Sequence, residues 1–265
     1  MPSKNKVHET DEHLDQRWFL IELEESISAL NEHKLDATRL KEFNVNLCHL
    51  SLDQTSKLKP RFFAPRPNLP QPSDEILNEA CAPDSPAHSD PYSLAYNMHL
   101  DWSSYAFHQV NLDDYGPWRS KDPGDYTPYK DIYQYGTPSL GFPSFGAFET
   151  MDSAGREFPH FKAVIYNDLE ADSNSCFRGE VLISLRLMLG QLSKMRLVHH
   201  QIAPVLLISL AGRRARLLES YFDQKSKSLM MRSSDLYELN NKTSISEAFK
   251  TLTGYFFGGP AGNTV

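Results

Sequence analysis

The sequence predicts an α+β fold, in which a small, mostly antiparallel sheet is flanked by helices and wrapped by an irregular, aromatic-rich segment. In residues 178–257, the spacing of the apolar residues predicts a helix, three strands and a second helix, in that order. Residues 92–161 carry many rings between glycines and prolines, without a lasting period. Residues 11–31 carry one apolar stripe at helical spacing. A chain of 265 residues suffices for one such domain, so we expect a single cooperative unit.

The carboxy-terminal part, residues 161–265, supplies the predicted core. Its first helix, over 178–197, has so broad an apolar face that near-complete burial is expected. Residues 203–210 form a continuous apolar run, which is typical of a central strand. Short connections favour an antiparallel meander. The expected strands and the closing helix are 161–166, 203–210, 216–223, 228–232 and 244–257.

The amino-terminal part, residues 1–60, is expected to be helical. A first helix over 11–31 is predicted by apolar residues that recur three and four positions apart, and a second helix is expected over 37–50. Such a stripe is most simply buried on the protein's own core, with a coiled-coil contact to a second copy as the alternative. The stripe consists of Leu20, Leu23, Ile27 and Leu30.

The middle part, residues 61–160, is expected to wrap around the core. Its first stretch is dense in proline, which excludes a helix or a central strand there. Ser73, followed by two acidic residues, predicts the start of a short helix. The rings of 92–161 must be shielded from water by the core, a ligand or a partner. An aromatic cover over the core and one wall of a ligand pocket are compatible interpretations.

Charge and cysteine content limit the function classes. The formal net charge of −7 removes the usual electrostatic drive for general nucleic-acid binding. Three distant cysteines, Cys48, Cys81 and Cys176, argue against a disulfide framework or a zinc site. The first residues lack the apolar region of a secretory signal, and no apolar run reaches transmembrane length. We therefore expect a cytoplasmic protein that does not enter membranes.

The order helix, three strands, helix resembles the core of the PD-(D/E)XK nucleases. In that resemblance Glu180 matches the helix carboxylate, and Asp223-Gln224-Lys225 matches the (D/E)xK element. The run 203–211 contains no acid that could match the family's earlier strand aspartate. Two carboxylates are the minimum for holding magnesium over a phosphate. The resemblance therefore implies a degenerate nuclease-like domain.

Short phrases in the same region are similar to a group of filamentous-fungal proteins without a known activity. This similarity implies an origin in fungal specialised metabolism and brings no catalytic residues with it. The phrases are Gly179-Glu180-Val181, residues 200–209, Tyr221-Phe222-Asp223 and residues 258–264.

Other polar clusters have ordinary and functional interpretations. His199 and His200 follow a predicted helix, whose carboxyl end favours positive charge. His99, Asp101 and His108 are similar to the metal set of some iron oxygenases, but too few strands are expected for the barrel fold of those enzymes. The arginine turn, Arg213, Arg214 and Arg216, is either a solvated face or an anion site.

The functional hypothesis is a cofactor-independent enzyme or binding protein for an apolar or aromatic small molecule, without a metal site. The alternative is a protein-interaction scaffold or a degenerate nuclease-like domain, and a homodimer is left open. Single acidic and histidine side chains in an aromatic pocket can perform acid–base work without a cofactor. The candidate acid–base residues are Asp101, His108, Glu180 and Asp223. The candidate ligand-binding residues are Trp102, Tyr105, Trp118, Arg213 and Arg214.

Overall fold

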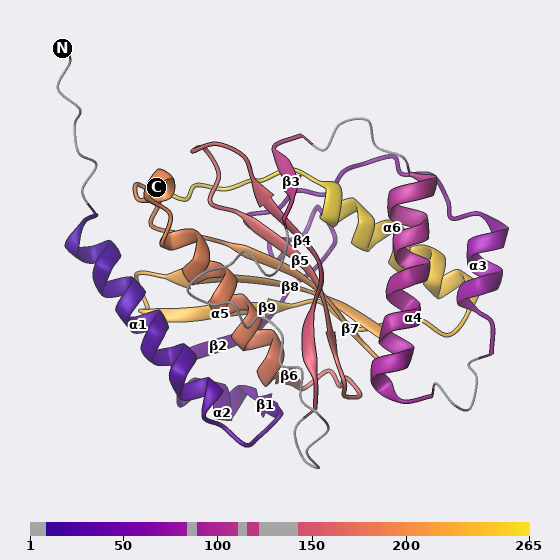
Figure 1. Ribbon diagram of the computed structural model, residues 1–265, viewed down its shortest axis with the longest axis horizontal. Coiled ribbons are helices and arrows are strands. Elements are labelled where there is room, and N and C mark those ends of the chain that lie inside the picture. Colours follow the sequence, from indigo (N-terminus) through magenta and orange to yellow (C-terminus); the bar gives the residue numbers. More distant parts are fainter. Residues whose placement is uncertain (1–8, 84–88, 111–115, 122–142) are drawn as a thin grey trace.

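The computed structural model describes residues 9–83, 89–110, 116–121 and 143–265. Its centre is an eight-stranded mixed sheet in the order β2-β9-β8-β7-β5-β4-β3, with β10 paired to β8 (Figure 1). The pairs β2·β9 and β5·β7 are parallel, and the other pairs of this sheet are antiparallel. The strands are β2 (Val45–His49), β3 (Trp118–Ser120), β4 (Phe145–Ser153), β5 (Phe161–Asn167), β7 (Val205–Ala211), β8 (Arg214–Asp223), β9 (Ser228–Ser233) and β10 (Tyr237–Glu238).

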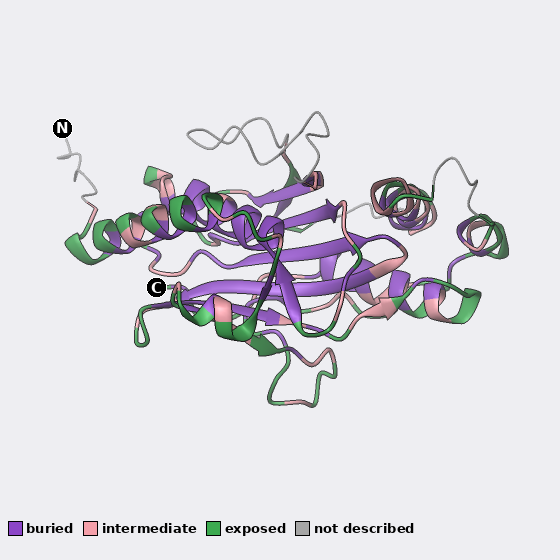
Figure 2. Cartoon of the chain, turned by 90° about the horizontal axis from the view of Figure 1, so that it is seen from below, coloured by how far each residue is buried: buried purple, intermediate pink, exposed green. Residues whose placement is uncertain are grey.

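Helices cover both faces of the sheet, so the molecule has three layers. One face packs against α1 (Asp11–Ser28) and α5 (Arg178–Leu192), and α5 is the crossover between the parallel strands β5 and β7. The other face packs against α3 (Asp74–Ala80), α4 (Pro91–Ser103), the short π-helix η2 (Ser104–Gln109) and α6 (Lys242–Phe257). Strands in the middle of such an arrangement are buried on both sides, as the purple colour in Figure 2 shows.

Smaller elements complete the fold. The strands β1 (Lys34–Asp36) and β6 (Ser175–Phe177) form a separate two-stranded ladder beside the amino-terminal end of α5. The short helix α2 (Ala37–Lys41) leads into β2, and the 3-10 turn η4 (Met195–Leu197) follows α5. Within the described ranges, no helix combines the length and apolar character needed to cross a bilayer.

The predicted α+β class is confirmed, and so is the order of elements in the carboxy-terminal part. The strands β7, β8 and β9 form the expected antiparallel meander between α5 and α6. The sheet is larger than expected, because β2, β3 and β4 add strands from outside residues 161–265. The stripe of α1 is buried on the protein's own core, where Leu20 and Ile27 have no exposed surface.

Two local predictions are corrected. A helix was expected over residues 37–50, but only α2 is helical and the rest contributes the edge strand β2. A turn at Asn44, with a φ of 57°, separates the two elements. The segment 92–161 was expected to be irregular, but it contains most of α4 and the whole of η2, β3 and β4. Aromatic residues occur on both the buried and the exposed side of α4, as Trp102 and Tyr96 show, so the helical period is obscured.

The rings of this segment are largely shielded where the structure describes them. Trp102, Tyr105 and Trp118 are each at most 4 % exposed, whereas Tyr96 remains 41 % exposed. The helix predicted to begin after Ser73 is α3, with the Ser73 hydroxyl accepting from the amide of Ile76. Rings of residues 111–115 and 122–142 lie outside the described residues.

Candidate functional site

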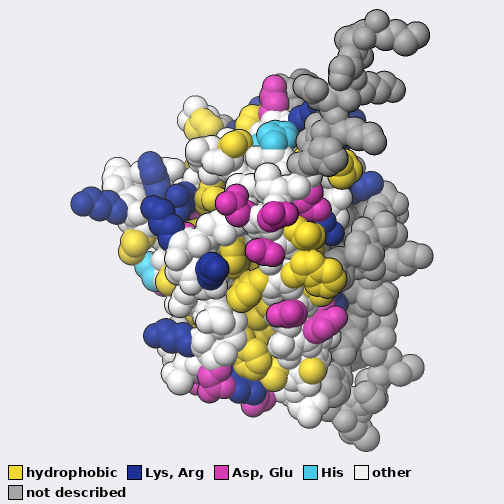
Figure 3. Space-filling view, turned by 90° about the vertical axis from the view of Figure 1, so that its left-hand side faces the viewer, with side chains coloured by type: hydrophobic (Ala, Val, Ile, Leu, Met, Phe, Trp, Pro, Cys, Tyr) yellow, Lys and Arg dark blue, Asp and Glu magenta, His cyan; other side chains and the backbone are white. Residues whose placement is uncertain are grey.

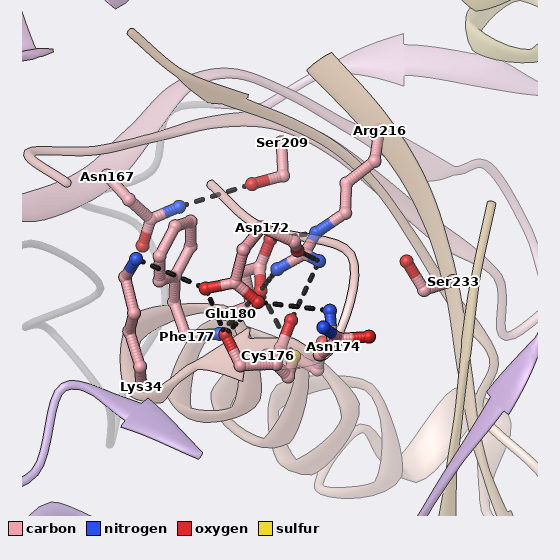
Figure 4. A network of polar contacts seen from close by, with 12 residues as sticks. Lys34, Asn167, Asp172, Asn174, Cys176, Phe177, Glu180, Ser209, Arg216 and Ser233 are labelled. Atoms are coloured by element: carbon pink, nitrogen blue, oxygen red, sulfur yellow. Dashed lines mark hydrogen bonds and ion pairs between the residues drawn. The ribbon is translucent and has the colours of Figure 1, made fainter. Parts of the chain in front are cut away.

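Glu180 lies at the amino-terminal end of α5, where sequence reasoning placed a catalytic carboxylate. It accepts hydrogen bonds from the Phe177 amide (2.7 Å) and the Cys176 thiol (3.0 Å), and it pairs with Arg216 of β8 through two contacts (2.8 and 2.5 Å) (Figure 4). The bond to Phe177 is the return half of a capping box, because Glu180 is the third residue of the helix. Local helix chemistry and a long-range ion pair therefore fix the same side chain.

The guanidinium group of Arg216, the partner of Glu180, also has internal hydrogen-bond partners. A terminal nitrogen of Arg216 donates to the carbonyl oxygens of Ser175 (2.8 Å) and Asp172 (3.3 Å). Burial alone would lower the pKa of Arg216, but the Glu180 carboxylate raises it above its usual range. Burial, and then the Glu180 charge, raise the pKa of the Cys176 thiol. This Glu180 network, consisting of Glu180, Arg216 and Cys176, therefore holds neither a free base nor a thiolate.

Little space adjoins the Glu180 network. Asn167, at the end of β5, donates to the hydroxyl of Ser209 in β7 (3.2 Å), and Lys34 pairs with Asp172 at the rim (Figure 4). A Cβ atom on Gly179 would lie 2.6 Å from the Phe145 ring, so only glycine allows this packing. The adjoining hollow measures about 10 Å³, which holds at most one water.

Asp223 lies at the opposite end of β8. It is seven residues beyond Arg216 along the strand, which corresponds to roughly 23 Å. Its carboxylate accepts from the amide and the hydroxyl of Ser226 in the β8–β9 turn, and these bonds hold the pKa of Asp223 below its usual value. Glu180 and Asp223 therefore share no site.

Asp101 and His108 also lie apart. Asp101 is half-buried in α4, and His108 is exposed on η2, seven residues further along the same continuous helical run. That separation corresponds to roughly 10 Å of helix rise, which is beyond direct proton transfer. His99 instead stacks on Phe148 (4.2 Å between centroids) and lies 3.7 Å from a carboxylate oxygen of Glu149.

Trp102 and Tyr105 pack inside the helical layer rather than around a pocket. Trp102 meets the Phe256 ring edge-to-face at 5.1 Å between centroids. The Tyr105 hydroxyl donates to the Pro70 carbonyl (2.6 Å), and burial raises the pKa of Tyr105 to about 12. Both rings connect α4 and η2 to α6 and to the proline-rich segment.

The arginine turn is occupied by internal partners. Arg213 donates to the carbonyls of Leu239 (3.0 Å) and Ala80 (2.6 Å). Arg214 pairs with Glu238 (2.8 Å) and donates to the Ala171 carbonyl (2.7 Å). These contacts join β8 to neighbouring loops, so the turn is a structural junction.

Trp118 borders a surface groove beside the end of α6. The groove has a volume of about 380 Å³ and lies between the proline-rich segment, β3 and the end of α6. The Trp118 indole donates to the Gly258 carbonyl (2.7 Å), which fixes the ring. The residues of this Trp118 groove used below are Pro65, Arg66, Pro67, Pro117, Trp118 and Phe257.

The groove exists because the proline-rich segment pairs with the end of α6. The amide of Ala64 donates to Gly259 (3.0 Å), and that of Arg66 donates to Gly254 (2.7 Å). A Cβ atom on Gly258 would lie 1.9 Å from the Ala64 carbonyl oxygen, so glycine is required there. At Gly259 a Cβ atom would meet nothing within 4 Å, because this position faces open space.

A buried lysine supports the floor of the groove. The Lys162 ammonium group donates to the carbonyls of Tyr255 (2.9 Å), Phe256 (3.1 Å) and Gly258 (2.6 Å), and it lies 3.8 Å from the centroid of the Trp118 ring. Burial lowers the pKa of Lys162, while the carboxyl end of α6 favours positive charge.

His160 lies close by and holds the carboxy-terminal tail. Its ring bonds to the Ala261 carbonyl (2.9 Å), and the side chain is almost fully buried. Burial first, and then the positive charge of Lys162, lower the pKa of His160 to about 4. His160 and Lys162 therefore hold residues 258–261 against the sheet.

Two further hollows continue along α6. One, of about 350 Å³, shares Pro65 and Arg66 with the Trp118 groove. The next, of about 610 Å³, lies between α3 and α6 and includes Lys250. In the part of the chain that the structure describes, no three His, Cys, Asp or Glu side chains are grouped to hold a metal. No family model, curated protein or solved structure matches this chain.

Of the sequence-predicted ligand residues, Trp118 alone is a residue of this groove. Arg66, Phe257 and the prolines at 65, 67 and 117 were missed. The proline-rich segment was interpreted as a wrapping element, and Gly258-Gly259 as a helix stop. Both interpretations describe the backbone correctly, but the adjacency of these segments depends on long-range pairing that no local pattern encodes.

Proposed function

We propose that this protein binds an apolar or aromatic small molecule carrying an anionic group, and that the Trp118 groove is the site. The supporting observation is the lining, which combines two rings, three prolines and one guanidinium group. Apolar walls with a few polar groups are typical of small-molecule sites, and an arginine fork suits a carboxylate or sulfonate. The volume of about 380 Å³ lies within the usual range for such sites.

We propose binding rather than catalysis, because the candidate acid–base residues do not converge on this groove. Asp101, His108, Glu180 and Asp223 are absent from its lining. Acid–base catalysis needs a group within hydrogen-bond reach of the reacting atom. The internal cation nearest the groove, Lys162, has its polar contacts with main-chain carbonyls.

A fluorescence titration with 8-anilinonaphthalene-1-sulfonate, an aromatic anion, tests the proposal. Gly259→Leu adds a side chain into open space, so it should fill the groove without disturbing the fold. We expect the affinity of the probe to fall at least about tenfold, because the apolar contact area is removed. Arg66→Met should lower the affinity for the sulfonate probe by roughly three- to tenfold. It should leave the affinity for an uncharged aromatic probe nearly unchanged.

Lys59→Met is the matched control, because Lys59 is an exposed cation outside the groove lining. Circular dichroism and thermal unfolding confirm that each variant is folded. Equal probe affinity in wild-type protein and folded Gly259→Leu would exclude the Trp118 groove as the binding site.

A second candidate is a nuclease-like scaffold without catalysis. The order of helix, three antiparallel strands and helix that motivated it occurs in α5-β7-β8-β9-α6, and again in α4-β3-β4-β5-α5. Among the described residues, Glu180 and Asp223 of the first set lie near opposite ends of β8, and Lys162 of β5 in the second set is buried. We expect no magnesium-dependent cleavage of DNA or RNA. Magnesium-dependent cleavage that is lost in Asp223→Ala would revive an active nuclease.

We also propose an intracellular setting for this function. Cys48, Cys81 and Cys176 are all unpaired, which suits a reducing compartment. Localisation of a fluorescent fusion tests this, and accumulation of the fusion outside the cell would contradict it.

A further inference from the structure

Helix α1 has a second apolar stripe on the side that faces away from the core. Leu14 and Trp18 are 40 % and 57 % exposed, and Ile21, one turn further, is half-buried where the stripe meets the edge of the core. The spacing of four and three residues places these side chains on one helix face, opposite the buried Leu20 and Ile27. An exposed tryptophan at the centre of such a stripe is a frequent anchor of protein–protein contacts.

Carboxylates surround this outer stripe. The face of the molecule at the α1 end of the sheet is shown in Figure 3, where Asp and Glu side chains lie around a hydrophobic area. The exposed acids of α1 are Asp11, Glu12, Asp15, Glu22 and Glu25. We call the outer stripe and these acids the α1 acidic face. A partner of matching chemistry must be basic and must carry an apolar contact.

The same end of the molecule carries a basic surface. In Figure 3, Lys and Arg side chains gather on the left of the acidic area. Leu58, which is 49 % exposed, lies between the exposed residues Lys57 and Lys59. The basic end, as we define it, consists of Lys57, Leu58, Lys59, Arg61, Lys225 and Lys227.

Side-chain contacts link both surfaces to strands β8 and β9. Gln224, in the β8–β9 turn, donates to Gln16 of α1, and the rings of Phe222 and Phe19 lie 5.3 Å apart. From the other side, Arg232 of β9 donates to the carbonyls of Leu58 (2.7 Å) and Lys59 (3.1 Å). The strands β8 and β9 and their connecting turn therefore lie between α1 and the loop that carries Leu58.

We infer that this end of the molecule binds a second copy of the chain, with the α1 acidic face of each copy on the basic end of the other. The acidic and basic surfaces are adjacent and complementary. A twofold axis between two copies therefore forms the same acidic–basic contact twice, once in each direction. Among the described residues, Lys225 and Lys227 have no ion-pair partner, so they are available to a second copy. Direct contact between two α1 helices is disfavoured, because their carboxylates repel.

Sedimentation velocity with a charge exchange tests the inference. Lys225→Glu/Lys227→Glu places like charges at both contacts and should raise the dimer dissociation constant at least about tenfold. Asp15→Lys/Glu22→Lys should do the same. Mixing the two variants should restore a dimer, because every contact again joins opposite charges. Trp18→Ala should weaken association without altering its salt dependence.

Lys242→Glu/Lys250→Glu is the matched control, since it makes the same charge change on α6 (Figure 1). It should leave the dissociation constant unchanged. A monomer at all concentrations at low salt, or failure of the mixed variants to associate, overturns the inference. A dimer that survives both charge reversals also overturns it, because another surface must then be responsible.

Discussion

The Glu180 network and the Trp118 groove contrast two ways in which a buried cation is used. At the amino-terminal end of α5, Arg216 meets a carboxylate and main-chain carbonyls, and the hollow beside them measures about 10 Å³. At the carboxyl end of α6, Lys162 meets main-chain carbonyls and a tryptophan face, and the adjoining groove measures about 380 Å³. The first region is closed, and the second is open to solvent.

The comparison shows that polar groups which stabilise the fold differ from groups that are open to a ligand. Glu180 carries the chemistry expected of a catalytic acid, but each of its oxygens is already hydrogen-bonded, and it has no contact with solvent. Trp118 carries no reactive group, but its ring is held in place at the edge of an open surface groove. A preorganised wall beside open volume is what a ligand needs, so accessible space decides between the two regions.

The largest effect is expected for Glu180→Ala. Removing one partner leaves the Arg216 charge buried and unpaired, which costs about 3–5 kcal/mol of unfolding free energy. Chemical denaturation of the variant and the wild-type protein measures this loss. The folded fraction of the variant should bind 8-anilinonaphthalene-1-sulfonate as the wild-type protein does, because the groove is at a different place in the fold.

Arg186→Met is the control for loss of a less buried ion pair, since the side chains of Arg186 and Glu24 keep 13 % and 10 % of their surface exposed, against 4 % and 0 % for Arg216 and Glu180. It should cost clearly less than Glu180→Ala. If both variants lost the same small amount, the Glu180 network would not be the structural centre described here.

The next effect is a pH dependence of the unfolding free energy, caused by His160, which lies beneath the groove. His160 has a pKa of about 4 in the folded protein and an ordinary value of 6.5, so the unfolded chain binds the extra proton between these values. The stability associated with neutral His160 is complete above pH 6.5 and is lost as the pH falls through 4. We expect a loss of about 3 kcal/mol over this window.

Urea unfolding of the wild-type protein and His160→Gln, at pH 7 and pH 4, measures this difference. Glutamine keeps a hydrogen-bond donor for the Ala261 carbonyl but does not titrate. The variant should lack this part of the pH dependence. Identical pH profiles for the two proteins would contradict the assignment of a low pKa to His160.

The smallest effect concerns thiol reactivity and leaves stability unchanged. Cys176 is fully buried and has a raised pKa, whereas Cys48 is exposed on the edge strand β2. Iodoacetamide should therefore modify Cys48 about a hundredfold faster than Cys176, or more. Peptide mass spectrometry after timed labelling measures both rates. Comparable rates in the native protein would mean that the Glu180 network opens readily.

Much of the fold could be predicted from the sequence, because its periodic elements are long. The apolar run in β7 and the broad face of α5 identify buried elements directly. The strands β2 and β4 were missed, since β2 is five residues at an edge and β4 contains an irregular pairing near Glu149. Short edge strands and bulges obscure the alternation that indicates a strand.

The candidate site was harder to predict, because its parts are far apart in the chain. Trp118 was identified as a ligand residue, but Arg66 and Phe257 belong to segments that meet only through the pairing of Ala64 with Gly259. Conversely, Glu180 and Asp223 appeared related in sequence but lie near opposite ends of β8. Residue type indicates possible chemistry, whereas burial and distance decide whether that chemistry is available.

Hydrogen exchange with and without saturating 8-anilinonaphthalene-1-sulfonate tests the contrast between the two regions most directly. Binding in the Trp118 groove should slow exchange of the amides in residues 61–69 and 254–260, and leave residues 175–184 unchanged. Protection confined to residues 175–184, or absent from both segments around the groove, would contradict the assignment of the binding site.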